Sequence, residues 1–244
     1  MTSRHFPILL ALVASLTCLN ACSVEYSAAP ISAQVVDGET GRPVAGVSVV
    51  ADWQLEGGLE GGNILGAVMV QETESDENGR FTFPAWGPKQ VERPPGVYAN
   101  ARVKGRAPGL TLFKSGYEYR ELQNYGSPDA DAKNLLSDWN GKNIKLIPIH
   151  GTPAKYVDQL DWISSSLMTY TASSQRCSAG KPCPAACQWQ NIPKTIRAIG
   201  RESKKLEADG IRRTTIDQEL IANEDVYRRL GCKSTSAVLG GANK

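Results

Sequence analysis

Hydrophobic positions alternate with polar ones in two stretches of the chain, and each stretch is broken by a tight turn. The first runs over 35–49 and turns at Asp37–Gly41; the second runs over 70–83 and turns at Asp76–Gly79. Alternation with a period of two puts the apolar side chains on one face of a strand. Asp, Asn and Gly are residues that tight turns favour. Each stretch therefore predicts an antiparallel pair of strands with one buried face.

The hydrophobic period changes to three or four residues after His150, which is the period of a helix with one apolar face. The first helix is predicted to start after Thr152, and the second near Ile192 or Pro193. The third is predicted to start after Thr215, and glycines follow the last two helices. These amphipathic helices should dock on one another and on the strands. The sequence thus predicts an α+β fold with an N-terminal antiparallel β domain and a C-terminal helical region.

An apolar run over 6–16 follows a short basic N-terminus. It is too short to span a bilayer comfortably and is typical of a cleaved signal peptide. The run leads to Leu19-Asn20-Ala21-Cys22, which resembles a bacterial lipobox, although Asn20 is unusual there. Cys22 is therefore predicted to carry a lipid, and an ordinary secretory signal is the alternative. Ser23, in place of an Asp retention signal, favours the outer membrane, facing the periplasm.

These patterns divide the chain into five segments. The residues just after Cys22 are small and polar enough for a tether. The expected boundaries are a signal peptide at 1–21, a tether at 22–30, a β-sandwich at 31–150, a helical domain at 151–232 and a flexible tail at 233–244.

The two turn stretches resemble the carboxypeptidase regulatory-like domain, a seven-stranded β-sandwich related in shape to transthyretin. Phe113–Tyr117 resembles the closing element of that family, so the resemblance covers about residues 31–149. It implies a sandwich fold, and it implies no catalysis, because the family's peptidases carry their His and Glu ligands in a separate domain. The matching positions are Val36, Thr40, Gly41, Pro43, Val44, Gly46, Val47, Thr73, Asp76, Gly79, Phe81 and Phe83.

Charge and chemistry narrow the function further. The chain has 27 basic and 25 acidic residues; removal of 1–21 takes away Arg4 alone and leaves 26 against 25, a net charge of +1. That balance argues against a dedicated nucleic-acid binder. His150 is the single histidine after the signal, and no G-x-S-x-G motif occurs. We therefore expect no enzyme activity, no metal and no cofactor.

Four cysteines remain after Cys18 is removed with the signal and Cys22 is lipidated. An even number in an exported domain predicts disulfides, and zinc is the weaker alternative because no C-x-x-C motif is present. Two of the four flank a short loop with Gly and Pro. The other two lie before the second helix and after the third, where a helical hairpin would bring them together. The predicted pairs are Cys177 with Cys183 and Cys187 with Cys232.

Basic residues fall along one side of the second helix, opposite its isoleucines. Such a run is ordinarily a solvated face. On a membrane-anchored protein it is also a candidate surface for anionic head groups or a periplasmic partner. The residues of this candidate face are Arg197, Arg201, Lys204 and Lys205.

Three aromatic residues, Trp53, Trp86 and Tyr98, are predicted to belong to the core, with a ligand groove as the alternative. Taken together, the patterns predict a lipid-anchored cell-envelope protein that acts as a non-catalytic binding or structural module. Its expected partners are the membrane, through the lipid, and an envelope protein or saccharide. The alternatives are a saccharide- or peptidoglycan-binding lipoprotein and an accessory protein of a hydrolase.

Overall fold

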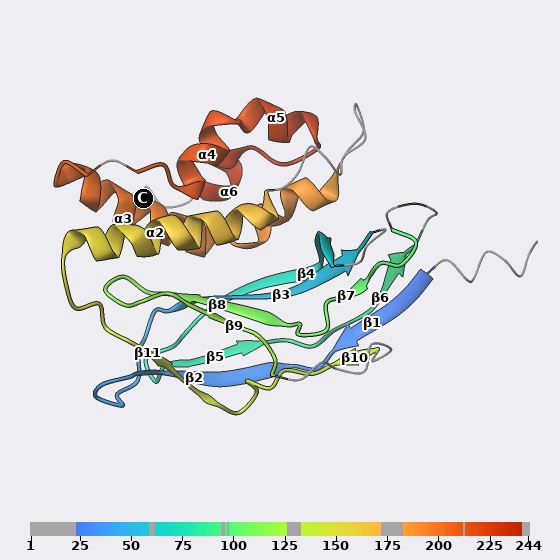
Figure 1. Ribbon diagram of the computed structural model, residues 1–244, viewed down its shortest axis with the longest axis horizontal. Coiled ribbons are helices and arrows are strands. Elements are labelled where there is room, and N and C mark those ends of the chain that lie inside the picture. The colour runs from blue at the N-terminus through green and yellow to red at the C-terminus, as the bar shows by residue number, and fades with distance from the viewer. Residues whose placement is uncertain are drawn as a thin grey trace, which may run out of the picture.

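The computed structural model describes residues 23–58, 62–93, 96, 98–125, 133–171, 183–211 and 213–240. Its N-terminal part consists of β sheets and its C-terminal part of helices, which confirms the predicted α+β order (Figure 1). Within the described residues, none of the helices combines the length and apolar character that crossing a membrane requires.

The strands and helices follow in chain order. The strands are β1 (Ser23–Ala28), β2 (Ile31–Asp37), β3 (Ser48–Gly57), β4 (Asn63–Glu74), β5 (Arg80–Phe83), β6 (Trp86–Glu92), β7 (Arg102–Val103), β8 (Gly109–Phe113), β9 (Arg120–Leu122), β10 (Asn134–Leu135) and β11 (Asn143–Leu146). The helices are α2 (Pro153–Leu167), α3 (Pro193–Ala208), α4 (Ile216–Ala222), α5 (Glu224–Arg229) and α6 (Thr235–Leu239), with short 3-10 helices η2 (Met168–Tyr170) and η3 (Pro184–Asn191).

The described strands form three sheets, and the helices cover one of them (Figure 1). The strand orders are β10-β1-β6, β11-β2-β5 and β4-β3-β8-β9, with β7 also paired to β3. Most pairings are antiparallel, as predicted, whereas β1 with β10 and β2 with β11 are parallel. The helices lie against the outer face of the β3 sheet, so this sheet is the middle layer of the molecule.

The first turn closes a short antiparallel pair, with Val36 bridged to Pro43, but the longer strands that flank each turn do not pair with each other as the sequence predicts. Each turn carries the chain from one sheet to another, so the strands pair between stretches. β2 pairs with β5, with Ile31 opposite Phe83, and β3 pairs with β4, with Ser48 opposite Glu74. The alternation itself was predictive, because Phe81 and Phe83 are both buried in the core.

Ser75 holds the two turns together. It is 5% exposed; its Oγ accepts a hydrogen bond from Val47 N at 2.9 Å and donates one to Val44 O at 2.8 Å. Val35 N also donates to Gly79 O at 2.7 Å. Gly79 has a φ of 72°, and a Cβ there would collide with the carbonyl oxygen of Val35. The bonds of Ser75 therefore hold the start of β3 beside the end of β4, at the point where the chain passes between the sheets. We call this point the sheet crossing at Ser75.

Strand β3 is buried on both faces, which separates two hydrophobic cores. Val49 and Trp53 point into the core between the sheets, whereas Val50 joins the core under the helices. The ring centroids of Trp53 and Trp86 lie 5.3 Å apart at 82°, an edge-to-face contact. The core interpretation of these two tryptophans is confirmed, and Tyr98 is partly buried against the same core.

The predicted tether at 22–30 is wrong for residues 23–28, which form β1. This strand pairs with β6 from Ser23 opposite Glu92 onward, and with β10. Tyr26 and Ala28 are buried and Val24 packs beside them, so alternate side chains enter the core. The small size of the neighbouring residues hid this period-two pattern in the sequence.

Helices α2 and α3 begin where the sequence predicted, at Pro153 and Pro193. Thr152 occupies the N-cap position of α2, although its side chain makes no capping hydrogen bond. The predicted third helix is interrupted at Asn223. The side-chain amide of Asn223 donates to the backbone and side-chain oxygens of Glu219, and such local bonds compete with a continuous helix.

The predicted flexible tail at 233–244 is wrong for residues 235–239, which form α6. Ser234 caps this helix, because its Oγ accepts a hydrogen bond from Ala237 N at 3.2 Å. Arg197 Nη1 of α3 donates to the carbonyl oxygen of Val238 at 3.1 Å. A cap and a contact across 41 residues therefore order this segment.

Helix α3 is fixed to the sheet by Glu72 of β4. Its carboxylate accepts hydrogen bonds from Lys194 N at 2.9 Å, Thr195 N at 2.6 Å and Thr195 Oγ1 at 2.7 Å. These donors lie in the first turn of α3, where a negative charge is favourable. Burial raises the pKa of Glu72, and the bonds from Thr195 and Lys194 oppose that rise.

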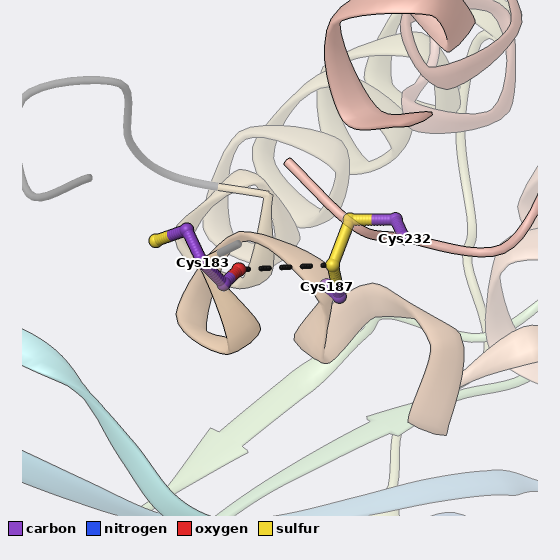
Figure 2. Close-up of a disulfide and its surroundings, with 3 residues drawn as sticks. All are labelled: Cys183, Cys187 and Cys232. Carbon is purple, nitrogen blue, oxygen red and sulfur yellow. Dashed lines mark hydrogen bonds between the residues drawn. A yellow bond between two sulfur atoms is a disulfide. The ribbon is translucent and has the colours of Figure 1, made fainter. Parts of the chain in front are cut away.

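The predicted Cys187–Cys232 disulfide is confirmed, with the Cα atoms 5.2 Å apart (Figure 2). It joins η3 to the segment after α5. Cys183 is also disulfide-bonded, and the Cys177 half of its predicted pair lies outside the described residues. The Sγ of Cys187 lies 3.7 Å from the carbonyl oxygen of Cys183, a packing contact because a disulfide sulfur carries no proton.

Asp52 of β3 is a buried carboxyl group between the sheet and the helices. It is 5% exposed, and its Oδ2 has no hydrogen-bond partner among the described residues. Burial raises the pKa of Asp52 to about 6; the side chains of Gln54 and Tyr170 and the charge of Lys104 offset burial only in part. Tyr170 is also buried, and its own burial together with the neighbouring Asp52 raises the pKa of Tyr170.

This raised pKa predicts a pH dependence of stability. Between about pH 4 and pH 6 the folded chain holds a proton on Asp52 that the unfolded chain releases, so stability falls as pH rises through this window. Asp52→Asn stays neutral. We expect it to raise the free energy of unfolding at pH 7 by up to about 3 kcal/mol, since one pKa unit is about 1.4 kcal/mol, and to change it little at pH 4.

Urea denaturation of both proteins at the two pH values measures this difference. Asp158→Asn, the same substitution on the exposed surface of α2, is the matched control. An Asp52→Asn variant that is less stable than the parent at pH 7 would contradict the buried-charge account.

Candidate functional site

A groove lies between α3 and the end of the middle sheet where β3 starts and β4 and β8 finish. Its volume is about 410 Å³. One wall is the side of α3 from Lys194 to Lys205, and the other includes Gly46, Glu74 and Lys114. The sheet crossing at Ser75 and the Glu72 contact to α3 place these two walls opposite each other. We call this cavity the basic groove.

Positive charge dominates the basic groove. Among the described residues, five basic and two acidic side chains line it, a difference of three positive charges. In the part of the chain that the structure describes, Lys114, Lys194 and Arg201 form no ion pair. The five basic residues are Lys114, Lys194, Arg197, Arg201 and Lys205, and the acidic ones are Glu74 and Glu202.

The helix presents these residues because of their spacing. Arg197, Arg201 and Lys205 recur every four residues and lie on one face of α3. Ile196 and Ile199 occupy the other side and are fully buried in the core under the helices. The apolar side thus sets the rotation of α3, and the rotation turns the basic side toward the groove.

Glu202 is a fixed negative charge in the groove wall. It is 5% exposed; Tyr156 donates its OH to Oε2 at 2.6 Å, and Lys205 Nζ donates to Oε1 at 2.6 Å. Burial opposes ionisation of Glu202, but the bonds from Lys205 and Tyr156 outweigh it and hold its pKa below the ordinary value. Burial and Glu202 together raise the pKa of Tyr156. Glu202 therefore remains ionised at neutral pH.

Three of the four residues predicted for the basic face line the groove: Arg197, Arg201 and Lys205. Lys204 is exposed and is not in the lining. The sequence analysis missed Lys194, although it lies one turn before Arg197 on the same face. It also missed Lys114, which comes from the end of β8 and which helical spacing cannot reveal.

The other candidate positions do not form a site with the groove. His150 Nε2 lies 2.6 Å from Glu39 Oε1 in an exposed pair. Asp37 accepts bonds from the backbone and side chain of Thr40, which lower its pKa to about 2. No group of three or more His, Cys, Asp or Glu side chains that could hold a metal ion occurs among the described residues. The lipidation candidate Cys22 lies outside them.

A second groove of about 520 Å³ runs between the edges of β4 and β6, and Tyr98 is part of its wall. The ligand-groove alternative for Tyr98 therefore has a place in the structure. However, Gln188 Nε2 donates to Ala67 O and Lys89 Nζ to Val68 O, both at 2.6 Å. These two bonds already occupy neighbouring carbonyl groups on β4, so this groove is the weaker candidate site.

No protein-family model matches the chain, and no curated protein matches it. Among solved structures it is similar to 3-chlorocatechol 1,2-dioxygenase from Rhodococcus opacus 1CP, with 17% identity and a TM-score of 0.30, over 52% of this chain and 62% of that one. Hydroxyquinol 1,2-dioxygenase from Pseudomonas putida DLL-E4 matches with 17% identity and a TM-score of 0.28, over 52% and 58%. The dioxygenase domain of a carbohydrate-binding fusion from Streptomyces sp. SirexAA-E matches with 18% identity and a TM-score of 0.23, over 52% and 82%. At these TM-scores the similarities carry no argument about family or activity.

Proposed function

We propose that this chain is a lipid-anchored protein of the bacterial cell envelope, placed on the outer membrane and facing the periplasm. It acts as a non-catalytic binding module, and its basic groove holds an anionic ligand. The observation that carries the proposal is the convergence of Lys114 from the sheet with the basic residues of α3 on one cavity. Saccharide binding remains the second candidate, and its own support is the wall position of Tyr98 in the groove beside β4.

The charge arrangement favours ligand binding over a structural role. Like charges four residues apart on a helix repel each other and slightly destabilise it. Arg197, Arg201 and Lys205 have this spacing, and within the described part of the chain only Lys205 has a carboxylate partner, Glu202. A concave site with a net charge of one sign concentrates counter-ions and speeds the arrival of charged partners. An anionic ligand would relieve the repulsion that the folded chain retains.

The resemblance to the carboxypeptidase regulatory-like domain is part of the proposal. The two turn motifs that suggested it meet through Ser75, and the closing element contributes Tyr117, whose OH donates to Asp37 Oδ2 at 3.0 Å. In the peptidases of that family such a domain accompanies a separate catalytic domain, which is consistent with a binding role here. A fold alone does not assign a function.

The lipid anchor predicts a simple change of location. Cys22→Ser removes the thiol that would carry the lipid, so the protein should move from the membrane fraction to the soluble periplasmic fraction. Cell fractionation with mass spectrometry of the N-terminus measures this. Cys18→Ser, a cysteine change inside the predicted signal peptide, should leave the protein in the membrane. Retention of Cys22→Ser in membranes with a processed N-terminus would contradict the anchor.

The groove predicts that Arg201→Glu weakens the binding of a labelled poly-glutamate probe by about tenfold or more, a loss of about 1.4 kcal/mol or more. Lys204→Glu makes the same charge change on the same helix outside the groove and should weaken binding by less than about threefold. Fluorescence anisotropy at low salt measures both dissociation constants. Equal losses in the two variants, or no binding by the parent protein, would refute a specific anion site.

A further inference from the structure

We infer that the groove holds an extended acidic peptide segment of another envelope protein, and that its acidic residues stand at alternate positions. This inference rests on the proposed function and names the partner of that same site. It chooses a protein partner in the aqueous phase over two other anionic ligands, which are the head groups of the anchoring bilayer and an acidic saccharide. Four features of the described structure support it.

The first feature is the spacing of the cations. A helix rises about 1.5 Å per residue, so Arg197, Arg201 and Lys205 are about 6 Å apart along α3. In an extended peptide, side chains on the same side are two residues, or about 6.6 Å, apart. Acidic side chains at alternate positions therefore meet successive cations along the wall of the groove.

The second feature is the length of the groove. Its wall on α3 extends from Lys194 to Lys205, a rise of about 17 Å. An extended chain advances about 3.3 Å per residue, so about five residues span this wall. Three of those five residues, at alternate positions, can turn acidic side chains toward α3.

The third feature is the chemistry of the lining. Glu202 is ionised and fixed, and Glu74 lies on the opposite wall, so a continuous run of acidic residues would meet repulsion that an alternating peptide avoids. Phe113 is the aromatic residue among the described residues that line the groove, and it is 3% exposed. A sugar ring would therefore find no open aromatic face for stacking. These contacts favour a peptide over a saccharide.

The fourth feature is the position of the groove relative to the lipid anchor. Cys22 directly precedes β1, whose pairing begins at Ser23 and leaves no tether. Tyr26 OH of β1 accepts a hydrogen bond from Val103 N at 3.4 Å, and Val103 pairs with Leu55 in β3. The start of β1 therefore lies at the end of β3 that is far from the groove, and Figure 1 shows β1 starting at the right while the turn after β8 lies at the left.

That separation is large compared with electrostatic screening. From Leu55 to Ser48, which lines the groove, β3 advances seven residues, or about 23 Å. At physiological ionic strength the Debye length is about 8 Å. The negative surface potential of a bilayer falls off within about one such length. Head groups at the Ser23 end therefore contribute little to the potential in the groove, which is left open to a partner in the aqueous phase.

The test uses the lipidated protein in vesicles and two labelled peptides of about ten residues with the same composition. One alternates Glu with Ser, and the other has its Glu residues in one block. The alternating peptide should bind about fivefold or more tightly than the block peptide, a preference that Arg201→Glu abolishes and Lys204→Glu preserves. Its dissociation constant should agree within about twofold between phosphatidylcholine vesicles and vesicles with about 30% phosphatidylglycerol.

The outcomes separate the inference from the proposed function. Equal or tighter binding of the block peptide would overturn the inference that the acidic residues stand at alternate positions. A dissociation constant about tenfold larger in phosphatidylglycerol vesicles would instead show that head groups compete for the groove. In either case Arg201-dependent binding of poly-glutamate would leave the anion site intact. Absence of binding by both peptides and by poly-glutamate would refute the proposed function itself.

Discussion

The candidate site depends on the hydrogen bonds between Glu72 and the first turn of α3. Glu72 belongs to the edge strand β4, and its carboxylate accepts three hydrogen bonds from Lys194 and Thr195. One side chain therefore links the sheet to the helix that supplies most of the positive charge. Together with the isoleucines of α3 that pack on the sheet, it sets the separation between Lys114 and Arg201.

The sequence predicted features that depend on local pattern. The period of apolar residues located α2 and α3, and the positions of Cys187 and Cys232 around the helices predicted their disulfide. Features that depend on topology were missed. Lys114 enters the groove only because β8 pairs with β3, and the strands exchange partners because Ser75 joins two distant turns. Neither relation leaves a signal in residue spacing.

The same physical argument connects the fold to the proposed role. Buried isoleucines and the Glu72 contact orient α3, so its basic side faces a cavity and not open solvent. Charge repulsion along that side is unfavourable for stability and favourable for an anionic ligand. Because β1 begins at Ser23, lipid at Cys22 would hold the opposite end of the sandwich at the membrane. With the proposed anchor, the basic groove would face the aqueous side.

The most direct measurement is the affinity of Glu72→Gln for the alternating acidic peptide, with circular dichroism to verify that the variant is folded. The substitution removes a negative charge near the groove, so electrostatics alone predicts tighter binding. The amide keeps one acceptor and places a donor against the amides of α3, which should displace the helix. Our account therefore predicts binding weaker by about fivefold or more. Unchanged or tighter binding by the folded variant would contradict the claim that Glu72 positions the groove.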